Sequence, residues 1–314
     1  MIVVRGLEAF PNPTRPAALA LGTFDGMHRG HQAVIDALRA AAQRIAGQAV
    51  AVTFEPHPIM VIAPPSEAFL LSTLEERIAL FEATGVDAVV IVGFDGAVRQ
   101  MDADAWLAWL EATVAPRAVV ASSTHTFGRN REGTPERLQR WAARHGVEAV
   151  VVPPVENGGM IISSSAIRDR LRAGDVRTAA EWLGRWYAVR GEVVPGEGRG
   201  RAIGVPTANL RVPPFKLVPA RGVYAAYARV GGQTFGAAVN VGVRPTFGSA
   251  VLCVEAHLLD VDVNLYGRTL ELAFVARLRD ERRFPSVDAL RTQLSKDVQT
   301  TRTTLSLINN NDLA

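Results

Sequence analysis

The chain has 314 residues, which is long enough for two domains with separate hydrophobic cores. Its apolar content of 48% and charged content of 21% are those of a globular protein, and they exclude a disordered or fibrous chain. The formal net charge of +3 is small and no run of five like charges occurs, so we expect no nucleic-acid partner.

Cys253 is the single cysteine, which excludes a disulfide within the chain and a CxxC metal site. Met1–Pro16 lacks a basic stretch followed by an apolar segment, and no stretch of ~18 apolar residues occurs. We therefore expect a cytosolic protein with no membrane partner. Its oligomeric state is not indicated.

The first half of the chain alternates short apolar runs with stretches of helical periodicity, a pattern typical of a parallel α/β sheet. The predicted strands are Ala17–Leu21, Ala49–Phe54, Ala88–Val92, Ala118–Val120 and Ala149–Val152. The predicted helices, with apolar positions every three or four residues, are Gln32–Ala46, Leu74–Thr84, Ala103–Thr113 and Pro135–His145.

Residues at the helix ends support these assignments. Thr134 followed by Pro135 is a favourable cap and first-turn pair, and Ser72 is a candidate cap for the helix that begins near Leu74. Gly85 and Gly146 stand where left-handed helix ends are expected.

After Gly184 the chain is rich in β-branched and aromatic residues with Gly and Pro between them, which predicts a small antiparallel β-barrel. The predicted strands are Val189–Val194, Val223–Val230, Thr234–Val241, Leu252–Leu259 and Leu270–Leu278. Ser286–Thr300 reads as one amphipathic helix capped by Ser286, followed by a loose tail over Leu305–Ala314.

We place the domain boundary near Leu183–Trp186. The predicted organisation is therefore an α/β domain over residues 1–183, a barrel with a C-terminal helix over 184–304, and the tail over 305–314.

The segment that follows the first predicted strand reads GTFDGMHRGH, over Gly22–His31. Its glycines let the backbone approach a phosphate, and a helix begins at about Gly30. His28 and His31 are three residues apart, so they share one face of the first helical turn and can stabilise charge on a triphosphate. We expect both histidines to be catalytic. The residues that we expect to bind the nucleotide here are Gly22, Phe24, Asp25 and Gly30.

Two other interpretations of this segment fail. A zinc site is excluded because no third ligand follows at a suitable spacing. A dinucleotide-binding turn is excluded because the GxGxxG pattern is absent.

A second phosphate-binding signal, ISSSAIR, covers Ile162–Arg168 after the fifth predicted strand. Hydroxyls and unpaired N–H groups at a helix start suit a phosphate, so Ser163 and Ser164 are candidate binding residues. Arg168 lies one turn into the helix and can bind a phosphate through its guanidinium group, so we expect it to be catalytic together with His28 and His31. Taken alone the segment is only a good helix start; together with GTFDGMHRGH it predicts one nucleotide site.

A third segment, GEGRGRAIGVPTANL over Gly196–Leu210, predicts a separate phosphate-binding loop on the barrel. Gly198, Arg199 and Gly200 are the expected phosphate contacts. Thr207 and Asn209 alternate along an extended stretch, so their oxygens face one side. Such hard oxygen ligands suit Mg²⁺ bound to ATP.

A kinase also needs a group that accepts the proton of the attacking hydroxyl. Glu255 lies inside a predicted strand, where a carboxylate is unusual, and it faces the same side as Cys253 and His257. We expect it to be catalytic; the alternative is a salt-bridged strand residue.

With these motifs in place, the chain from about Ala17 to Arg302 resembles the bifunctional bacterial riboflavin kinase/FAD synthetase family. In the first half the resemblance is carried by GTFDGMHRGH, TFEPHP, LSTLEER and ISSSAIR. In the second half it is carried by GEGRGRAIGVPTANL, GVYAAYA, NVGVRPTFG, VEAHLLD, DVNLYG and LRDERRF.

The resemblance implies a Rossmann-like nucleotidyltransferase domain that joins FMN to AMP, followed by a riboflavin kinase barrel. The implied substrates are ATP, riboflavin and FMN, and the implied cofactor is Mg²⁺ on Thr207 and Asn209. Glu255 matches the catalytic base of the family. Asn240 and Arg244 are implied flavin or phosphate contacts. Pro56 and Pro58 on either side of His57 predict an extended loop, which the resemblance implies to lie near the flavin; the alternative for His57 is a rigid turn that caps the sheet.

One stretch departs from the family pattern. Where the family carries an amide or carboxylate followed by an aromatic residue, this chain has Thr124 and His125. A hydroxyl reaches less far than a carboxamide and offers fewer hydrogen bonds, so we expect this departure to weaken the contact with the nucleotide. The alternatives left open are a riboflavin kinase whose first domain is impaired or altered in specificity, and a non-catalytic flavin-binding sensor. A class I aminoacyl-tRNA synthetase is disfavoured because no lysine-rich second signature is present.

Overall fold

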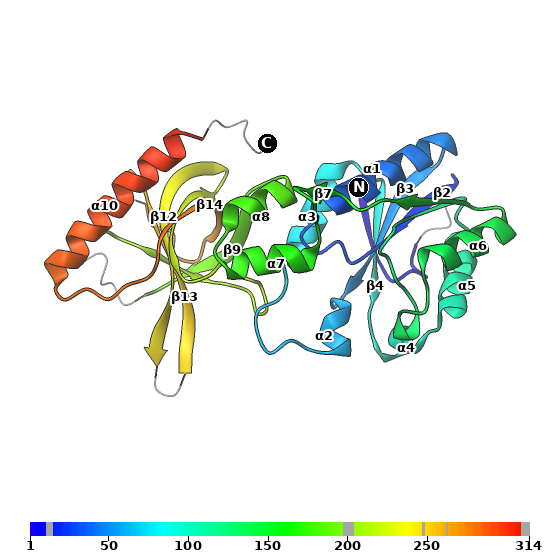
Figure 1. Cartoon of the computed structure of the whole chain (residues 1–314), viewed down its shortest axis with the longest axis horizontal. Helices are drawn as coiled ribbons and strands as arrows, with labels where there is room; N and C mark the ends of the chain where they lie inside the picture. Colours follow the sequence, from blue (N-terminus) through cyan, green and yellow to red (C-terminus); the bar gives the residue numbers. More distant parts are fainter. Residues whose placement is uncertain (11–14, 197–203, 247–248, 262, 309–314) are drawn as a thin grey trace. The chain divides into compact units, whose positions relative to one another are not determined.

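The computed structural model describes residues 1–10, 15–196, 204–246, 249–261 and 263–308, and from 244 to 251 it describes the backbone alone. By its internal contacts the chain forms two compact units, which are described separately below (Figure 1). The first consists of Met1–Glu67 and Ser72–Ser164, and the second of Ala68–Leu71 and Ser165–Ala314.

The first unit is built on a six-stranded parallel sheet with the strand order β1-β4-β3-β2-β5-β6. Its strands are β1 (Ile2–Arg5), β2 (Ala17–Leu21), β3 (Gln48–Glu55), β4 (Ala88–Gly93), β5 (Ala118–Ser122) and β6 (Glu148–Val152). All five predicted strands are confirmed. β1 was not predicted, because it is a four-residue edge strand with three exposed residues and shows no alternation long enough to detect.

Helices cover both faces of this sheet, as in a doubly wound α/β fold. They are α1 (Arg29–Arg44), α2 (Pro58–Ile62), α3 (Leu74–Thr84), α4 (Gly96–Gln100), α5 (Ala103–Val114) and α6 (Pro135–His145), with a 3₁₀ turn at Arg129–Arg131 and a small hairpin of β7 (Glu156–Asn157) and β8 (Met160–Ile161). The alternating side chains of β2 enter two separate cores. Leu19 and Leu21 pack on the side of α5 and α6, and Ala18 and Ala20 on the side of α1 and α3.

Of the four residues that the sequence named at helix ends in this unit, three are confirmed. Thr134 caps α6, and Gly85 and Gly146 adopt left-handed conformations at helix ends. The prediction that Ser72 caps α3 is wrong: Thr73 is the cap, in a reciprocal capping box with Glu76. Two adjacent hydroxyl residues compete for this position, and Ser72 instead bonds to the turn after β2.

The second unit contains a closed six-stranded antiparallel barrel with the order β10-β13-β12-β11-β14-β9. Its strands are β9 (Tyr187–Val194), β10 (Ala208–Arg211), β11 (Gly222–Val230), β12 (Gln233–Thr246), β13 (Ser249–Leu258) and β14 (Thr269–Arg279). The five predicted strands are confirmed. The short β10 closes the barrel between β9 and β13, and its local sequence was interpreted only as an extended stretch.

The helix α10 (Val287–Ser306) lies along the barrel and is capped by Ser286, as predicted (Figure 1). It continues past Thr300 to Ser306, so the tail was predicted to begin too early. Asp297 of α10, which is 4% exposed, forms a two-pronged ion pair with Arg279 of β14, with N–O distances of 2.9 and 2.6 Å. This pair attaches the helix to the barrel. Residues 309–314 of the predicted tail lie outside the described residues.

The second compact unit takes up the chain from Ser165, earlier than the predicted boundary near Leu183–Trp186. Two helices, α7 (Ser164–Arg172) and α8 (Val176–Leu183), precede that boundary and belong almost entirely to the second unit. α8 packs on β9 and β14, and the carbonyl of Leu171 in α7 accepts a hydrogen bond from the Ala220 N–H at 2.9 Å. Each helix of the described chain is too short or too polar to span a lipid bilayer.

Candidate functional sites

The turn after β2 brings the two predicted catalytic histidines together. His28 is the N-cap of α1, and its Nδ1 accepts a hydrogen bond from the His31 N–H at 3.3 Å. The two rings stack with their centroids 3.7 Å apart and their planes 20° apart. A Cβ at Gly30 would lie 3.1 Å from the His28 ring, so the glycine leaves room for it. The shared helix face that the spacing predicts is confirmed.

Phe24 and Gly22 support this pair from the core. The Phe24 ring is 1% exposed and lies 5.3 Å from the His31 ring and 5.1 Å from the Phe81 ring. A Cβ at Gly22 would lie 3.1 Å from the Phe24 ring. Both residues were predicted as nucleotide contacts, and the structure shows them packing the turn on which the histidines stand.

Asp25 is 1% exposed and holds the same turn from within. Its carboxylate accepts hydrogen bonds from the Ser72 N–H at 2.9 Å and from the Ser72 hydroxyl at 3.1 Å. The Gly26 N–H in turn donates to Ser72 Oγ at 3.0 Å. The role of Ser72 was missed because a single serine before a helix indicates a cap.

Ser164 connects the two predicted phosphate signals. Its hydroxyl donates to the carbonyl oxygen of Asp25 at 2.9 Å, across 139 residues of sequence. Ser163 immediately precedes α7. Ser164 itself therefore lies against the turn after β2, while the joint nucleotide site of the two motifs stays a prediction.

Arg77 of the LSTLEER segment is a positioning residue that was not assigned a role. It is 3% exposed and donates to the Thr23 carbonyl at 2.8 Å, to Thr53 Oγ1 at 3.2 Å and to Glu55 Oε2 at 2.7 Å. Burial lowers the pKa of its guanidinium, and Glu55 opposes that shift. Arg77 thereby fixes the turn after β2 to the end of β3.

Arg168 lies in the second unit by its contacts. Its guanidinium carbon lies 3.6 Å above the centre of the Phe69 ring, and its Nε donates to the Phe69 carbonyl at 2.7 Å. The side chain is 4% exposed. Its grouping with His28 and His31 around a triphosphate stays a prediction.

His57 has a local structural role as the cap of a short helix. The backbone is extended at His57, with φ −54° and ψ 133°, but the extended loop ends there because Pro58 begins the short helix α2 and His57 caps it. His57 Nδ1 accepts from the Ile59 N–H at 3.2 Å. Proline is well tolerated at the first position of a helix, which explains the difference. The expected position of His57 near a flavin stays a prediction.

The stretch that departs from the family pattern follows the end of β5. The hydroxyls of Ser122 and Thr124 lie 3.2 Å apart and share a hydrogen bond. The His125 ring stacks on Phe127 with a centroid separation of 5.9 Å and an interplanar angle of 21°. Thr126 Oγ1 accepts from Arg131 Nε at 3.1 Å.

In the barrel, strand register aligns three predicted site residues. Asn209 of β10 and Asn240 of β12 are both direct cross-strand partners of Glu255 in β13. Direct partners in neighbouring strands point to the same face of a sheet. Val254 and Ala256 on either side of Glu255 are buried, so this row of Asn209, Glu255 and Asn240 lies on the outer face of the barrel.

Neighbouring groups hold this row. Cys253 Sγ lies 3.3 Å from Glu255 Oε1 and 3.7 Å from Asn209 Oδ1, which confirms the shared face of Cys253 and Glu255. His257 Nδ1 donates to the Pro206 carbonyl at 2.8 Å, so the segment before Thr207 is attached to β13. A Cβ at Gly196 would lie 2.0 Å from Asn209 Nδ2, so any larger residue there would have to displace the Asn209 amide.

Glu281 is a further polar residue beside the row. A Cβ at Gly242 would lie 2.2 Å from Glu281 Oε1 and 3.2 Å from Asn240 Nδ2. Glu281 belongs to the LRDERRF segment, which carried the resemblance without a role for any of its residues. The predicted contacts Gly198, Arg199 and Gly200 lie outside the described residues, as does the side chain of Arg244.

The donors near the row fit a nucleotide-bound divalent cation. Asn209 is 8% exposed within β10, and the half-buried Thr207 stands just before that strand. Among the described residues, no three His, Cys, Asp or Glu side chains meet as an all-protein metal cage. Mg²⁺ needs fewer protein ligands than such a cage provides, because phosphates and waters complete its octahedron.

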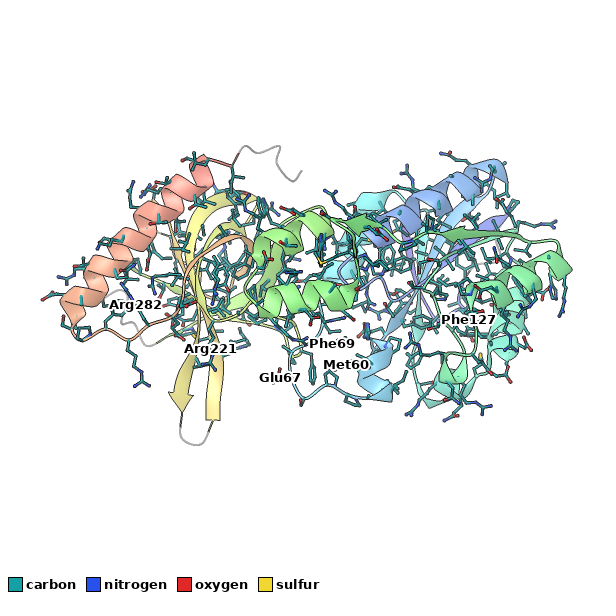
Figure 2. The ribbon with its side chains drawn as sticks, in the orientation of Figure 1. Met60, Glu67, Phe69, Phe127, Arg221 and Arg282 are labelled. Atoms are coloured by element: carbon teal, nitrogen blue, oxygen red, sulfur yellow. The ribbon has the colours of Figure 1, made fainter. Side chains whose placement is uncertain are left out.

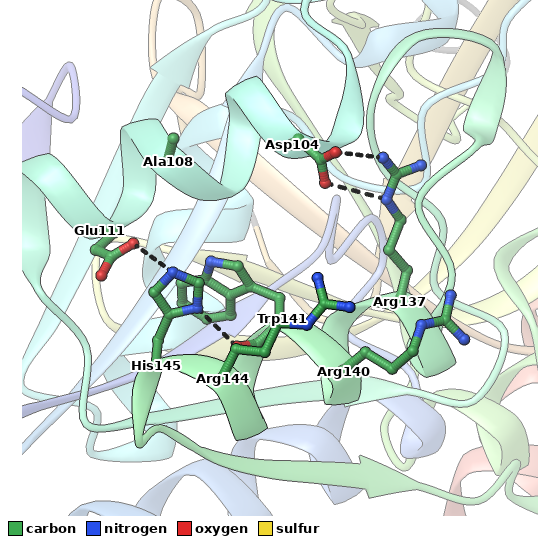
Figure 3. Close-up of a pocket in the computed structure, with 8 residues that line it drawn as sticks. All are labelled: Asp104, Ala108, Glu111, Arg137, Arg140, Trp141, Arg144 and His145. Atoms are coloured by element: carbon green, nitrogen blue, oxygen red, sulfur yellow. Dashed lines mark hydrogen bonds and ion pairs between the residues drawn. The ribbon is translucent and has the colours of Figure 1, made fainter.

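A surface hollow of about 440 Å³ lies between α5 and α6 (Figure 3). Asp104 pairs with Arg137 at 2.8 Å, and His145 Nε2 lies 3.5 Å from Glu111 Oε2. The pairing with Arg137 lowers the pKa of the Asp104 carboxyl. No predicted site residue lines this hollow.

Comparisons with known proteins extend over both units. The family model described as FAD synthetase matches residues 11–166, and the one described as riboflavin kinase matches residues 183–305. A bifunctional riboflavin kinase/FMN adenylyltransferase of Pseudomonas fluorescens is 33% identical over 305 residues, covering 96% of this chain and 97% of the relative. Its counterpart in Listeria monocytogenes is 34% identical over 286 residues, covering 90% and 91%.

A solved structure from Streptococcus pneumoniae shares the fold. It has a TM-score of 0.89 and 30% sequence identity, and the match covers 96% of this chain and 99% of that one. It is described as a macrolide-efflux protein, an activity that neither matching family model names.

Proposed function

Because the chain belongs to the bifunctional riboflavin kinase/FMN adenylyltransferase family, we propose that it makes FMN from riboflavin and FAD from FMN, using one ATP in each step. The observation that carries this proposal is the presence, in one chain, of the Asn209–Glu255–Asn240 row and the stacked pair His28–His31. Each lies within the family model for the corresponding activity.

The kinase step belongs to the row on the barrel. The terminal hydroxyl of the riboflavin side chain attacks the γ-phosphorus of ATP. The bond between the γ-phosphorus and the β,γ-bridging oxygen breaks, and ADP leaves. Glu255 accepts the hydroxyl proton. Asn240 and Arg244 contact the flavin or its phosphate, and Gly198, Arg199 and Gly200 contact the ATP phosphates.

ATP-dependent kinases and nucleotidyltransferases need a divalent cation. We assign Mg²⁺ to the Thr207 hydroxyl and the Asn209 amide oxygen. When bound, the cation neutralises charge on the β- and γ-phosphates. Cys253 and Glu255 set the position of the Asn209 side chain from the neighbouring strand.

The adenylylation step belongs to the turn after β2. A phosphate oxygen of FMN attacks the α-phosphorus of ATP, the bond to the α,β-bridging oxygen breaks, and pyrophosphate leaves. Nδ1 of His28 accepts the His31 N–H, so neutral His28 carries its proton on Nε2 and donates from there. We assign the triphosphate to His28, His31, Ser163, Ser164 and Arg168, with Gly22, Asp25 and Gly30 shaping the turn. Positioning and charge stabilisation supply the catalysis.

To test this, the purified protein is incubated with riboflavin, ATP and Mg²⁺, and the products are identified over time by mass spectrometry. The account predicts FMN first and FAD later, with ADP and pyrophosphate as coproducts. FMN that accumulates without FAD indicates a kinase with an impaired first unit. Tight flavin binding with no consumption of ATP indicates a sensor.

A further inference from the structure

The ends of β2 and β5 lie at the point where the strand order of the sheet reverses. From β2 the chain continues outward through β3 and β4 on one side, then returns to β5 and β6 on the other. In open α/β sheets, ligands bind in the crevice beyond the carboxyl ends of strands at such a point. The turn with His28 follows β2, and the stretch with His125 follows β5.

His125 is held rigidly at this position. The main-chain N–H of His125 donates to the Ser122 carbonyl at 3.0 Å, and the His125 ring stacks on the Phe127 ring. Phe127 is 8% exposed in the core of the α/β unit (Figure 2) and exchanges two main-chain hydrogen bonds with Gly133, of 3.1 and 2.8 Å. A Cβ at Gly133 would lie 2.5 Å from the Phe127 ring, so ring and glycine fit tightly.

The Nε2 atom of His125 is buried and has no hydrogen-bond partner among the described residues. Burial lowers the pKa of this imidazole to about 4, so the ring is neutral at pH 7. Native proteins rarely leave a buried nitrogen unsatisfied, because the lost hydrogen bond to water is not replaced. A donor or acceptor group that reaches this nitrogen would satisfy it.

We propose that His125 determines substrate specificity in the nucleotidyl-transfer site, by hydrogen bonding through Nε2 to the polar edge of a flat heteroaromatic ring. This inference rests on the proposed function. The ring belongs to one of the two substrates of that step, as the adenine of ATP or the flavin of FMN.

The chemistry favours such a ring over a phosphate. A neutral imidazole on an aromatic platform adds no positive charge, whereas the N-terminus of α1 beside His28 supplies the favourable field for an anion. A ring edge offers uncharged donors and acceptors, which match a neutral nitrogen.

The test compares His125→Phe with wild type in steady-state adenylylation, varying ATP and FMN separately. Phenylalanine keeps the stacking area and removes Nε2, so we expect the KM of one substrate to rise about 3- to 10-fold, the value of one neutral hydrogen bond. A rise for ATP assigns the adenine and a rise for FMN assigns the flavin. His125→Gln, whose amide nitrogen reaches a similar point, recovers part of the loss.

The matched control is His145→Phe, an exposed histidine on α6 of the same unit, which should leave both KM values unchanged. Binding of FMN and of a non-hydrolysable ATP analogue gives a second readout that does not depend on turnover. A wild-type chain that forms no FAD contradicts the proposed function, while weaker binding by His125→Phe still supports this inference. Wild-type KM values and wild-type binding of both ligands by a folded His125→Phe protein would overturn it.

Discussion

In the α/β unit the candidate catalytic histidines stand on the turn beyond a strand and on the first turn of the helix that follows it, whereas in the barrel Glu255 stands on a strand. The turn that carries His28 is held by side-chain hydrogen bonds from three buried residues, Asp25, Ser72 and Arg77. In the barrel, the main-chain ladder itself aligns Asn209 and Glu255. Turn-borne sites therefore depend on a supporting network, and strand-borne sites depend on register.

The largest expected effect comes from Glu255→Gln. Removing the group that accepts the proton should lower FMN formation by about 10²- to 10⁴-fold, while conversion of added FMN to FAD stays intact. Separate assays of the two steps measure this. Glu271→Gln is the control, because Glu271 is a strand carboxylate paired with Arg229 on β11. Loss of both activities in a folded Glu255→Gln protein would show that the sites are not independent.

The reciprocal change is His31→Ala. It removes one preorganised donor next to the positive end of a helix, so adenylylation should fall by about 10²- to 10³-fold, with the kinase rate preserved. His145→Ala serves as the exposed control in the same unit. Loss of FMN synthesis in His31→Ala would count against the assignment of the two sites.

Alkylation of the single cysteine probes the barrel site without changing its sequence. The Cys253 thiol touches Glu255 and lies next to Asn209, so an added acetamide group should displace both side chains. A displacement of ~1 Å can cost about 10²-fold in rate. Iodoacetamide should therefore lower the kinase rate and spare adenylylation, and Cys253→Ser should resist the reagent. Full kinase activity of a completely alkylated protein would place Cys253 away from the reacting groups.

A smaller effect concerns the pH dependence of the α/β unit. The folded chain holds the pKa of His125 at about 4 by burial, whereas the unfolded chain protonates near the ordinary value of 6.5. The unfolded state then binds more protons between these values, so the free energy of unfolding falls as the pH drops through them, by at most about 3 to 4 kcal/mol. His125→Phe should remove this slope. NMR titration of the histidine rings checks the pKa itself, and a value near 6.5 would contradict the burial.

The sequence predicted those features of the fold that depend only on residues close together in the chain. The helix-start chemistry of Thr134 and the positive backbone angle at Gly85 need no distant partner, and both were placed correctly. The five longer strands of each unit could be read from their apolar runs.

The remaining features depend on contacts between distant residues. β10 has four residues and is a strand only because β9 and β13 lie on either side of it. Strand pattern placed Glu255 on a face with Cys253, but the register that brings Asn240 beside it is set across β12 and β13. Arg77 and Ser72 carried no local sign that they would hold a turn some fifty residues away.

The most direct test of two independent sites in one chain mixes the two single variants. Glu255→Gln and His31→Ala are each incubated with riboflavin, ATP and Mg²⁺, alone and together, and the flavins are separated by chromatography. The account predicts that each variant alone makes FAD far more slowly than wild type, that His31→Ala accumulates FMN, and that the mixture makes FAD much faster than either variant, from FMN released into solution. A mixture that yields no FAD, although each variant is folded, would contradict it.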